Sequence, residues 1–435
     1  MSHRSIFKSL IGFSKQVMES LPDSRLPSNA QKYDVCEAGM GALSVFMFQD
    51  ASFLLPQQRL CDATGRHNFK SMFGIDSIPT PNQIRNILDP VSPDEFHGLY
   101  DQALHLLQSH KGLSQFEYLK NSTLIALDGS EYHSSQKIHC PCCNHRTHSG
   151  VKTYFHSAIL ASIVSPDSKE VIPLIPEFMT PQDGHQKQDC ENTAAKRWFS
   201  KHATRYNALN PTYLGDDLYS RQPICEAVME QGGHFIFVCK PSSHKILHEY
   251  VSGVSLEKTT VSTKKRHKKY RYQYQFMNQV PLKDGDDGLL VNWLSVSEID
   301  PKTGKVVYKN SFITNHTLSA DNVHQMAQAG RSRWKIENEN NNTLKTKGYR
   351  FEHNYGHGKK NLSSVFATLT IVAFLYHTVM NIVDLLYIKA KEAQGSRVNF
   401  YNNIKSLIRF ICFKSWEQLM EFILKPPDER PLIEI

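Results

Sequence analysis

The stretch TLIALDGSEY at residues 123–132 decides the fold class of this 435-residue chain. Its apolar run leads into Asp128, and a short apolar run bounded by polar residues is typical of a buried strand. Two more β-rich stretches follow, VKTYFHSAILASIV at 151–164 and EVIPLIPEFM at 170–179. We therefore predict three consecutive strands that pair as an antiparallel meander, with Asp128 at the end of the first strand.

Helices and strands alternate after this meander. The segments at 186–209 and 221–233 have helical patterns, whereas PTYLGDD at 211–217 and HFIFVCK at 234–240 have strand patterns. Three strands, helix, strand, helix and strand is the order of an RNase H-like sheet. We therefore predict an α/β fold with an RNase H-like mixed sheet, whose first part comprises residues 121–240.

A helical region is expected before this core. We predict that residues 1–120 are a helical DNA-binding region, in which Thr80 caps a helix that begins at Pro81. The polar face of this helix carries Arg85, a residue type that contacts bases and phosphates. An ordinary polar helix face is the simpler alternative for that surface.

A second helical region is expected at the other end, over residues 361–435. Its apolar segment at 362–388 contains His377, Asn381 and Asp384. Because ionisable and amide side chains are costly in a bilayer, we expect buried core helices here rather than a membrane span.

A β-rich insertion is expected at residues 241–318, before the core resumes at 319–360 with its last helix and a phosphate-binding loop. The stretch KKRHKKYRYQYQF at 264–276 alternates cations and aromatic residues. Cations contact phosphates and tyrosines stack on bases, which makes Lys264, Lys265 and Arg266 candidate DNA-binding residues. The alternative is a solvated edge strand whose aromatic side chains face the core.

Charge and cysteine content narrow the functional class. The formal net charge of +8 favours a polyanionic partner over an acidic surface or an uncharged ligand. Nine cysteines, an odd number, occur without an N-terminal secretory signal, so we expect reduced thiols and a cytoplasmic protein.

Three acids are the strongest candidates for catalysis. Asp128 and Asp216 follow predicted strands that lie side by side in an RNase H-like sheet, and Glu337 lies on the helix after the insertion. Arg333 precedes Glu337 by four residues and therefore shares its helical face. Carboxylates that converge in this way bind Mg²⁺ or Mn²⁺ for phosphodiester chemistry.

The chain also resembles bacterial insertion-sequence transposases of the DDE type, in the group with a Tyr-Arg-Glu-Lys pattern near the last acid. The resemblance rests on the order and spacing of five segments. They are RHNFKSMFGIDSIPTPNQIRNILDP (66–90), IALDGS (125–130), LGDDLY (214–219), RWKIENENNNTLK (333–345) and GYRFEHNYGHGKK (348–360).

The resemblance implies that Asp128, Asp216 and Glu337 are the catalytic acids and that Arg333 holds a phosphate near the cut. Asp216 is preferred to Asp217 because the pattern places an aromatic residue three positions later, here Tyr219. Two positions depart from the pattern. Its tyrosine is replaced by Gly330, and its lysine falls one residue late, at Lys345.

The activity implied by the resemblance is cleavage of transposon ends and joining of the freed 3′-hydroxyl to target DNA. The implied partners are double-stranded DNA and a second copy of the chain, which would form a homodimer on DNA in the bacterial nucleoid. Three alternatives remain open: a catalytically degenerate DNA-binding relic, an RNase H-like nuclease without strand transfer, and a zinc hydrolase.

Two further groups of residues are candidates for binding. In the segment 348–360, Arg350, His353 and His357 are expected to contact phosphate beside the acids, the alternative being a glycine-bent connection. Lys345, shortly before this segment, is a further candidate DNA-binding residue. Cys140 and Cys143 have the Cys-x2-Cys spacing of a structural zinc site. For its other ligands we predict His145 and His148, with His133, His139 and Cys142 as competitors; free thiols in a polar loop are the alternative.

Overall fold

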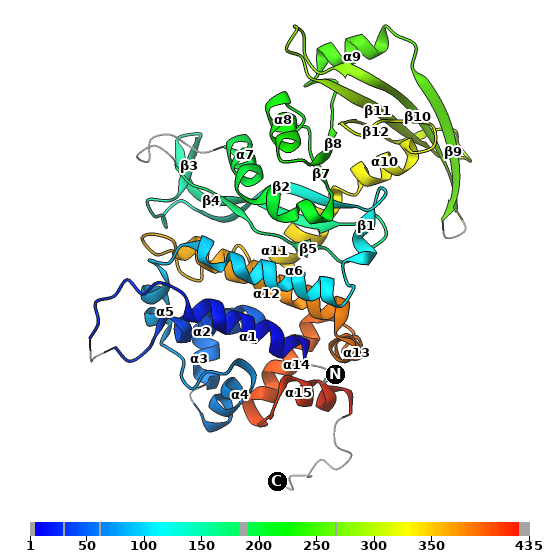
Figure 1. Ribbon diagram of the computed structural model, residues 1–435. Coiled ribbons are helices and arrows are strands. Elements are labelled where there is room, and N and C mark those ends of the chain that lie inside the picture. The colour runs from blue at the N-terminus through cyan, green and yellow to red at the C-terminus, as the bar shows by residue number, and fades with distance from the viewer. Residues whose placement is uncertain (1–4, 29–30, 61, 182–189, 266–267, 426–435) are drawn as a thin grey trace.

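The computed structural model describes residues 5–28, 31–60, 62–181, 190–265 and 268–425. Within these residues the protein is a mixed α/β fold with one large sheet, which confirms the predicted α/β class (Figure 1). The main path of the sheet runs β3-β4-β2-β7-β8-β12-β11-β10-β9, while β1 pairs with β2 and both β5 and β6 pair with β4. The strands are β1 (Glu117–Tyr118), β2 (Ser122–Ser135), β3 (Asn144–His148), β4 (Val151–Val164), β5 (Ile172–Pro173), β6 (Glu177–Met179), β7 (Pro211–Gly215), β8 (His234–Val238), β9 (Glu257–Lys265), β10 (Lys268–Pro281), β11 (Leu290–Ile299) and β12 (Val306–Thr314).

Strand β2 is the centre of this sheet, and it is longer than predicted. It pairs antiparallel with β4 from Leu124 to Ser135, so Asp128 lies inside the strand and not at its end. Its parallel pairing with β7 stops at Ala126. Asp128 therefore lies beyond the end of β7 but is still held by β4, which leaves its side free for residues from other elements.

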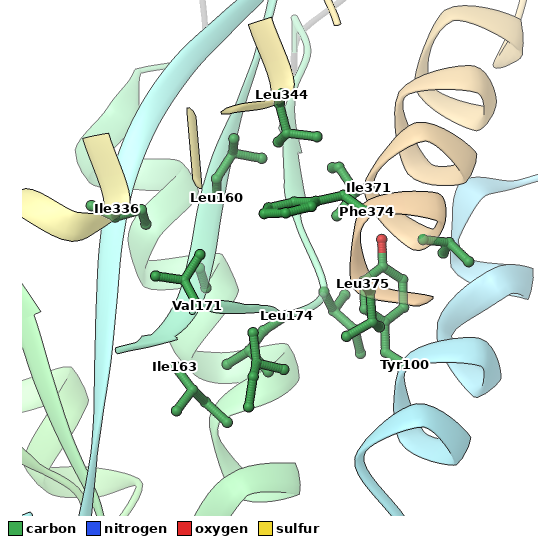
Figure 2. Packing of buried hydrophobic residues seen from close by; sticks show 14 of the residues in the cluster. Tyr100, Leu160, Ile163, Val171, Leu174, Ile336, Leu344, Ile371, Phe374 and Leu375 are labelled. Carbon is green, nitrogen blue, oxygen red and sulfur yellow. The ribbon is translucent and has the colours of Figure 1, made fainter. Parts of the chain in front are cut away.

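Helices cover both faces of the central strands. Helices α7 (Glu191–His202) and α8 (Gln222–Glu230) lie on one face, and α6 (His97–Ser109) and α12 (Leu362–Val383) lie on the other (Figure 1). A buried face on each side explains why β2 is buried at six consecutive positions, Ser122 to Leu127, instead of at alternate ones. The core between sheet and helices includes Tyr100, Leu160, Ile163, Val171, Leu174, Ile336, Leu344, Ile371, Phe374 and Leu375 (Figure 2).

The two ends of the chain form a single helical layer under the sheet. In Figure 1 the blue N-terminal helices and the orange and red C-terminal helices lie side by side. Ser14 bonds Tyr376, and Asn68 donates to the carbonyls of Ile408 and Ile411. The helices are α1 (Ile6–Glu19), α2 (Val35–Met47), α3 (Leu54–Leu60), α4 (Ala63–Phe73), α5 (Pro81–Leu88), η1 (Pro93–Phe96), η2 (Ser114–Phe116), α13 (Leu385–Ala393), α14 (Arg397–Phe410) and α15 (Trp416–Leu424).

Helix α12 is the core of this layer. Among the described residues it is the one helix long and apolar enough to cross a membrane, yet 89% of its most apolar 18-residue window is buried inside the protein. Its polar His377 bonds the hydroxyl of Tyr349 at 2.7 Å. The interpretation of this segment as core helix, with a second helix after Asp384, is therefore confirmed.

The predicted insertion extends the sheet. Strand β12 pairs antiparallel with β8 through Ile313 and Phe237, and β11, β10 and β9 continue outward from it. The insertion also contains helix α9 (Lys245–Ser252). The remaining helices are η3 (Ala203–Leu209), before the insertion, and α10 (Val323–Arg331), the π-helix η4 (Ile336–Asn341) and α11 (Asn342–Thr346), after it.

The tyrosines of the basic stretch face the core, as in the alternative interpretation. Tyr272 and Tyr274 are 8% and 1% exposed, and the hydroxyl of Tyr274 bonds His324 of α10 at 2.7 Å. They are therefore not available for stacking on bases. Lys264 is exposed on the edge strand β9, whereas the side chain of Lys265 and the whole of Arg266 lie outside the described residues.

Gly330 has a packing role that explains the missing tyrosine. It lies on α10 where that helix crosses the sheet, and a Cβ there would come within 2.9 Å of Ile236 and Phe312. No larger side chain fits without moving the helix. The close approach of α10 to β8 and β12 therefore leaves no room for a tyrosine at position 330.

We expect Gly330→Ala to lower the melting temperature, because overpacking costs about 1–3 kcal/mol and outweighs the higher helix propensity of alanine. Gly12→Ala is the matched control, since a Cβ at Gly12 on the exposed face of α1 meets no atom within 4 Å. That variant should be stabilised by about 1 kcal/mol. Thermal unfolding of both variants measures the difference, and equal stabilisation by both would contradict the packing of α10.

Candidate functional site

Asp128 is the centre of a carboxylate cluster. Its Oδ2 accepts a hydrogen bond from Nδ2 of Asn341 at 2.8 Å, which orients the carboxyl group. Burial, together with the nearby charges of Glu337, Glu191 and Asp216, raises the pKa of Asp128 to about 7, although the charge of Arg333 opposes the increase. A carboxyl group surrounded by other carboxylates is a site that favours a cation.

Asp216 reaches the cluster from the end of β7, as predicted. Its Oδ1 accepts the backbone N–H of Leu218 at 2.8 Å, which closes a tight turn. The neighbouring Asp217 points elsewhere, because it accepts the backbone N–H of Lys240 at 2.6 Å and the hydroxyl of Ser243. Asp217 therefore stabilises the loop after β8 and is not an alternative member of the cluster.

Glu337 and Arg333 enter from the segment after α10. Nη1 of Arg333 donates to Oε1 of Glu337 at 2.6 Å, so the two side chains share one face. Glu337 belongs to the π-helix η4, in which the N–H of Asn342 bonds the carbonyl of Glu337. Such π-turns inside helices are frequent at functional sites because they displace side chains from the regular helical positions.

Glu191 is a fourth acid that the sequence analysis missed. It is the first residue of α7, and its Oε1 accepts the backbone N–H of Gly129 at 3.2 Å and the hydroxyl of Tyr219 at 3.2 Å. A Cβ at Gly129 would come within 2.7 Å of the Glu191 carboxyl group, so glycine lets this carboxyl group lie against the backbone next to Asp128. Burial, followed by the charge of Asp216, raises the pKa of Glu191.

A signal for Glu191 exists in the sequence, although it is weak. The residue is an acid at the start of the helix that follows the three-strand meander, and a helix start lies at the end of the sheet near strand termini. Nothing in the local pattern distinguishes it from an ordinary acid in the first turn of a helix. Only the contact with Gly129, 62 residues away in sequence, places it beside Asp128.

The cysteine pair lies near other histidines than predicted. Cys140 and Cys143 approach His156 of β4 and His357 of the segment after α11, and the ligand atoms of all four lie within 4.8 Å of one another. His145 instead packs near Tyr154, and His148 is exposed and contacts Ser149. The predicted ligand set is therefore wrong in both of its histidines, although its two cysteines lie together.

The expected phosphate-binding residues are distributed differently from the prediction. His357 belongs to the cysteine group, and Lys345 pairs with Glu352 at 3.0 Å. Arg350 and His353 are exposed, in a turn where Arg350 has a positive φ of 54°.

Arg85 is held by the protein itself. Its Nε donates to the carbonyl of Tyr355 at 3.0 Å, its Nη1 donates to Asn82 at 3.2 Å, and its guanidinium lies 5.8 Å from the ring centroid of Phe53. These contacts fix α5 against the segment 349–360. They give Arg85 a structural role that the polar pattern of its helix did not indicate.

No model of a known protein family matches the chain, and a search of curated proteins finds no similar sequence. The functional argument therefore depends on the residues and their geometry.

Because the pKa of Asp128 is raised in the folded protein, we expect this residue to make the folded state less stable as the pH rises. Between the ordinary value of 3.8 and about 7, the folded protein retains a proton that the unfolded chain has released, so stability falls as the pH rises. Asp128→Asn removes this penalty. The gain in melting temperature over the native protein should grow from pH 5 to pH 7 in a chelating buffer and stay constant above that.

Asp287→Asn is the control, because the exposed Asp287 pairs with Lys283, which lowers its pKa. It should show no gain at any pH. Excess Mg²⁺ should shrink the advantage of Asp128→Asn, since a bound cation offsets the crowded charges. A gain from Asp128→Asn that is the same at pH 5 and pH 8 would rule out the proposed titration.

Proposed function

We propose that this protein is a DNA transposase that cuts transposon ends and joins the freed 3′-hydroxyl to target DNA. The observation that carries this proposal is the convergence of Asp128, Asp216 and Glu337 on one point from three distant parts of the chain. Stability of the fold does not explain this convergence, because carboxylates that lie close together without a compensating charge destabilise a folded protein. Such an arrangement is retained where a cation and its chemistry need it.

The strand order supports an RNase H-like interpretation of the central sheet. Strands β5 and β6 pair with β4, β4 pairs antiparallel with β2, and β2, β7 and β8 run parallel. Helices α7 and α8 stand between the later strands in sequence, in the predicted order. This is the arrangement that would bring the acids of a DDE transposase together.

The donor set fits magnesium or manganese. Asp128, Asp216, Glu191 and Glu337 offer carboxylate oxygens, which hard divalent cations prefer over thiolate or imidazole. When bound, such ions supply activation of water and stabilisation of the leaving oxygen in phosphodiester cleavage. The protein contributes the positions of the carboxylates, and Asn341 orients the most buried of them.

Arg333 is the residue best placed to hold the scissile phosphate. A planar guanidinium has five N–H donors, so it can bind a phosphate oxygen in addition to the carboxylate of Glu337. Its position one helical turn before Glu337 brings positive charge to the acids, where a phosphate would otherwise be repelled.

The partners follow from this chemistry. Double-stranded DNA is the substrate, and paired cutting and joining at two ends calls for a homodimer on DNA. The formal charge of +8 supports a polyanionic partner, and exposed cations such as Lys264 and Arg350 are available for phosphate contact. We place the protein in the bacterial cytoplasm, associated with the nucleoid.

Two alternative functions use the same fold. An RNase H-like nuclease would cut without joining, and a degenerate DNA-binding protein would do neither. The acid cluster is complete and Arg333 is in place, which favours an active enzyme over the degenerate protein. Strand transfer with pre-cut ends distinguishes a transposase from a nuclease.

Replacement of Asp128, Asp216 or Glu337 by Ala should abolish magnesium-dependent end cleavage and strand transfer. Removal of one metal-binding carboxylate costs far more than a change in DNA affinity, so DNA binding should survive. Cleavage is measured on DNA that carries the ends flanking the reading frame, with Asp287→Ala as the control of unchanged activity. Undiminished strand transfer by any of the three variants would remove that acid from the proposed site.

Arg333→Lys should lower the cleavage rate by about 10²-fold or more, because lysine cannot reproduce two-point contact with a phosphate. Melting temperature is measured in parallel, since lysine can still pair with Glu337 and should preserve the fold. Normal cleavage by Arg333→Lys would show that Arg333 acts only as the ion-pair partner of Glu337.

A further inference from the structure

Four residues from three separate segments meet at one end of the antiparallel pair β2–β4, which we call the central hairpin. Cys140 and Cys143 lie in the connection from β2 to β3, His156 lies on β4, and His357 lies in the segment that follows α11. The two cysteines and His156 are at most 7% exposed, so the group is nearly closed to solvent. The magnesium chemistry proposed above does not use any of them.

Five of the six distances between the four ligand atoms are close to the edges of a zinc-centred tetrahedron, and the sixth, between Cys140 and His357, is at most 4.8 Å. Sγ of Cys140 and Sγ of Cys143 are 3.9 Å apart, and Nε2 of His156 and Nε2 of His357 are 3.3 Å apart. The sulfur–nitrogen distances are 3.4 Å for each cysteine to His156 and 3.2 Å for Cys143 to His357. Zinc–ligand bonds of about 2.3 Å to sulfur and 2.0–2.1 Å to nitrogen give tetrahedron edges of about 3.8, 3.5 and 3.3 Å.

Hydrogen bonding alone does not account for this convergence. Both histidines present Nε2, and a ring nitrogen can donate at most one proton, whereas each Nε2 here faces more than one neighbour. A disulfide does not account for it either, because the sulfur–sulfur distance of 3.9 Å is far from the bonded value of about 2.05 Å. One cation at the centre satisfies all four atoms together.

The surrounding residues hold the ligands in these positions. The N–H of Cys140 donates to Sγ of Cys143 at 3.4 Å, and the N–H of Cys143 donates to the carbonyl of Cys140, which closes a tight turn. The ring of His156 stacks on Tyr132 at 5.6 Å between centroids. Backbone N–H donation to a cysteine sulfur stabilises its thiolate form, the form that binds metal.

We propose that Cys140, Cys143, His156 and His357 form a structural zinc site. Two thiolates and two imidazoles select zinc over the hard cations suited to the carboxylate cluster. Since four protein ligands fill a tetrahedral site, no position is open for a substrate, and the zinc has no part in catalysis. This separates the site from the zinc-hydrolase alternative.

The effect of the zinc is to fasten the segment 349–360 to the central hairpin. His357 also contacts the ring of His133, and Sγ of Cys142 donates to the carbonyl of Lys360 at 3.3 Å. The far end of the segment is held by Asp89, which accepts the N–H groups of Lys359 and Lys360. Zinc binding therefore orders the connection between the helix of Glu337 and the core helix α12.

Metal analysis of the full-length protein, purified without added zinc, tests this inference independently of any transposase activity. About one zinc ion per chain is expected. His156→Ala and His357→Ala should lose it, whereas His145→Ala and His148→Ala, the matched controls on the neighbouring strand β3, should retain it. His357→Cys should also retain zinc, because it substitutes one ligand for another and controls for loss through misfolding.

Substitution with Co²⁺ gives a second measurement. The native protein should show the intense visible bands of a tetrahedral site with two thiolates, and these should change in His357→Cys, which adds a third sulfur. Protease cleavage within residues 349–360 should become faster on chelation of the metal. Absence of bound zinc in a folded protein that also fails to take up Zn²⁺ or Co²⁺, or loss of zinc in His145→Ala but not in His156→Ala, would overturn the proposal.

Discussion

The structure depends on how far along β2 each of its two neighbouring strands pairs with it. Antiparallel β4 accompanies β2 along almost its whole length, while parallel β7 stops at Ala126. Past that point β4 still holds one edge of β2 while β7 no longer pairs with the other, so the backbone of Asp128 is fixed and residues from other elements can approach its side chain. Asp216 follows the end of β7 directly, and Glu191 at the start of α7 enters the same opening.

Much of this arrangement could be predicted from local patterns. Strand β4 has the predicted bounds, and Thr80 caps the helix that begins at Pro81, as predicted. These features depend on residues close in sequence, and the hydrophobic period or cap chemistry determines them. The order of elements then placed Asp128, Asp216 and Glu337 near one another.

What could not be predicted depends on contacts between distant segments. Glu191 is identified by its bond to Gly129, and His156 and His357 are identified by their approach to the cysteines. The predicted ligands His145 and His148 follow Cys143 closely in sequence. They lie on β3, however, and the extended strand directs its side chains alternately to opposite faces and carries both histidines away from Cys143. Proximity in sequence is a poor guide to metal ligands once a strand intervenes.

The helical layer built from both ends of the chain has a consequence for synthesis on the ribosome. Helices α1, α2 and α6 are translated first, but α12, against which they pack, begins only at Leu362. At about 5–20 residues per second, the early helices wait on the order of tens of seconds for their partner. During that interval their apolar faces are exposed and are natural clients for chaperones. The nascent protein therefore completes this layer only after residues 362–383 have been synthesised.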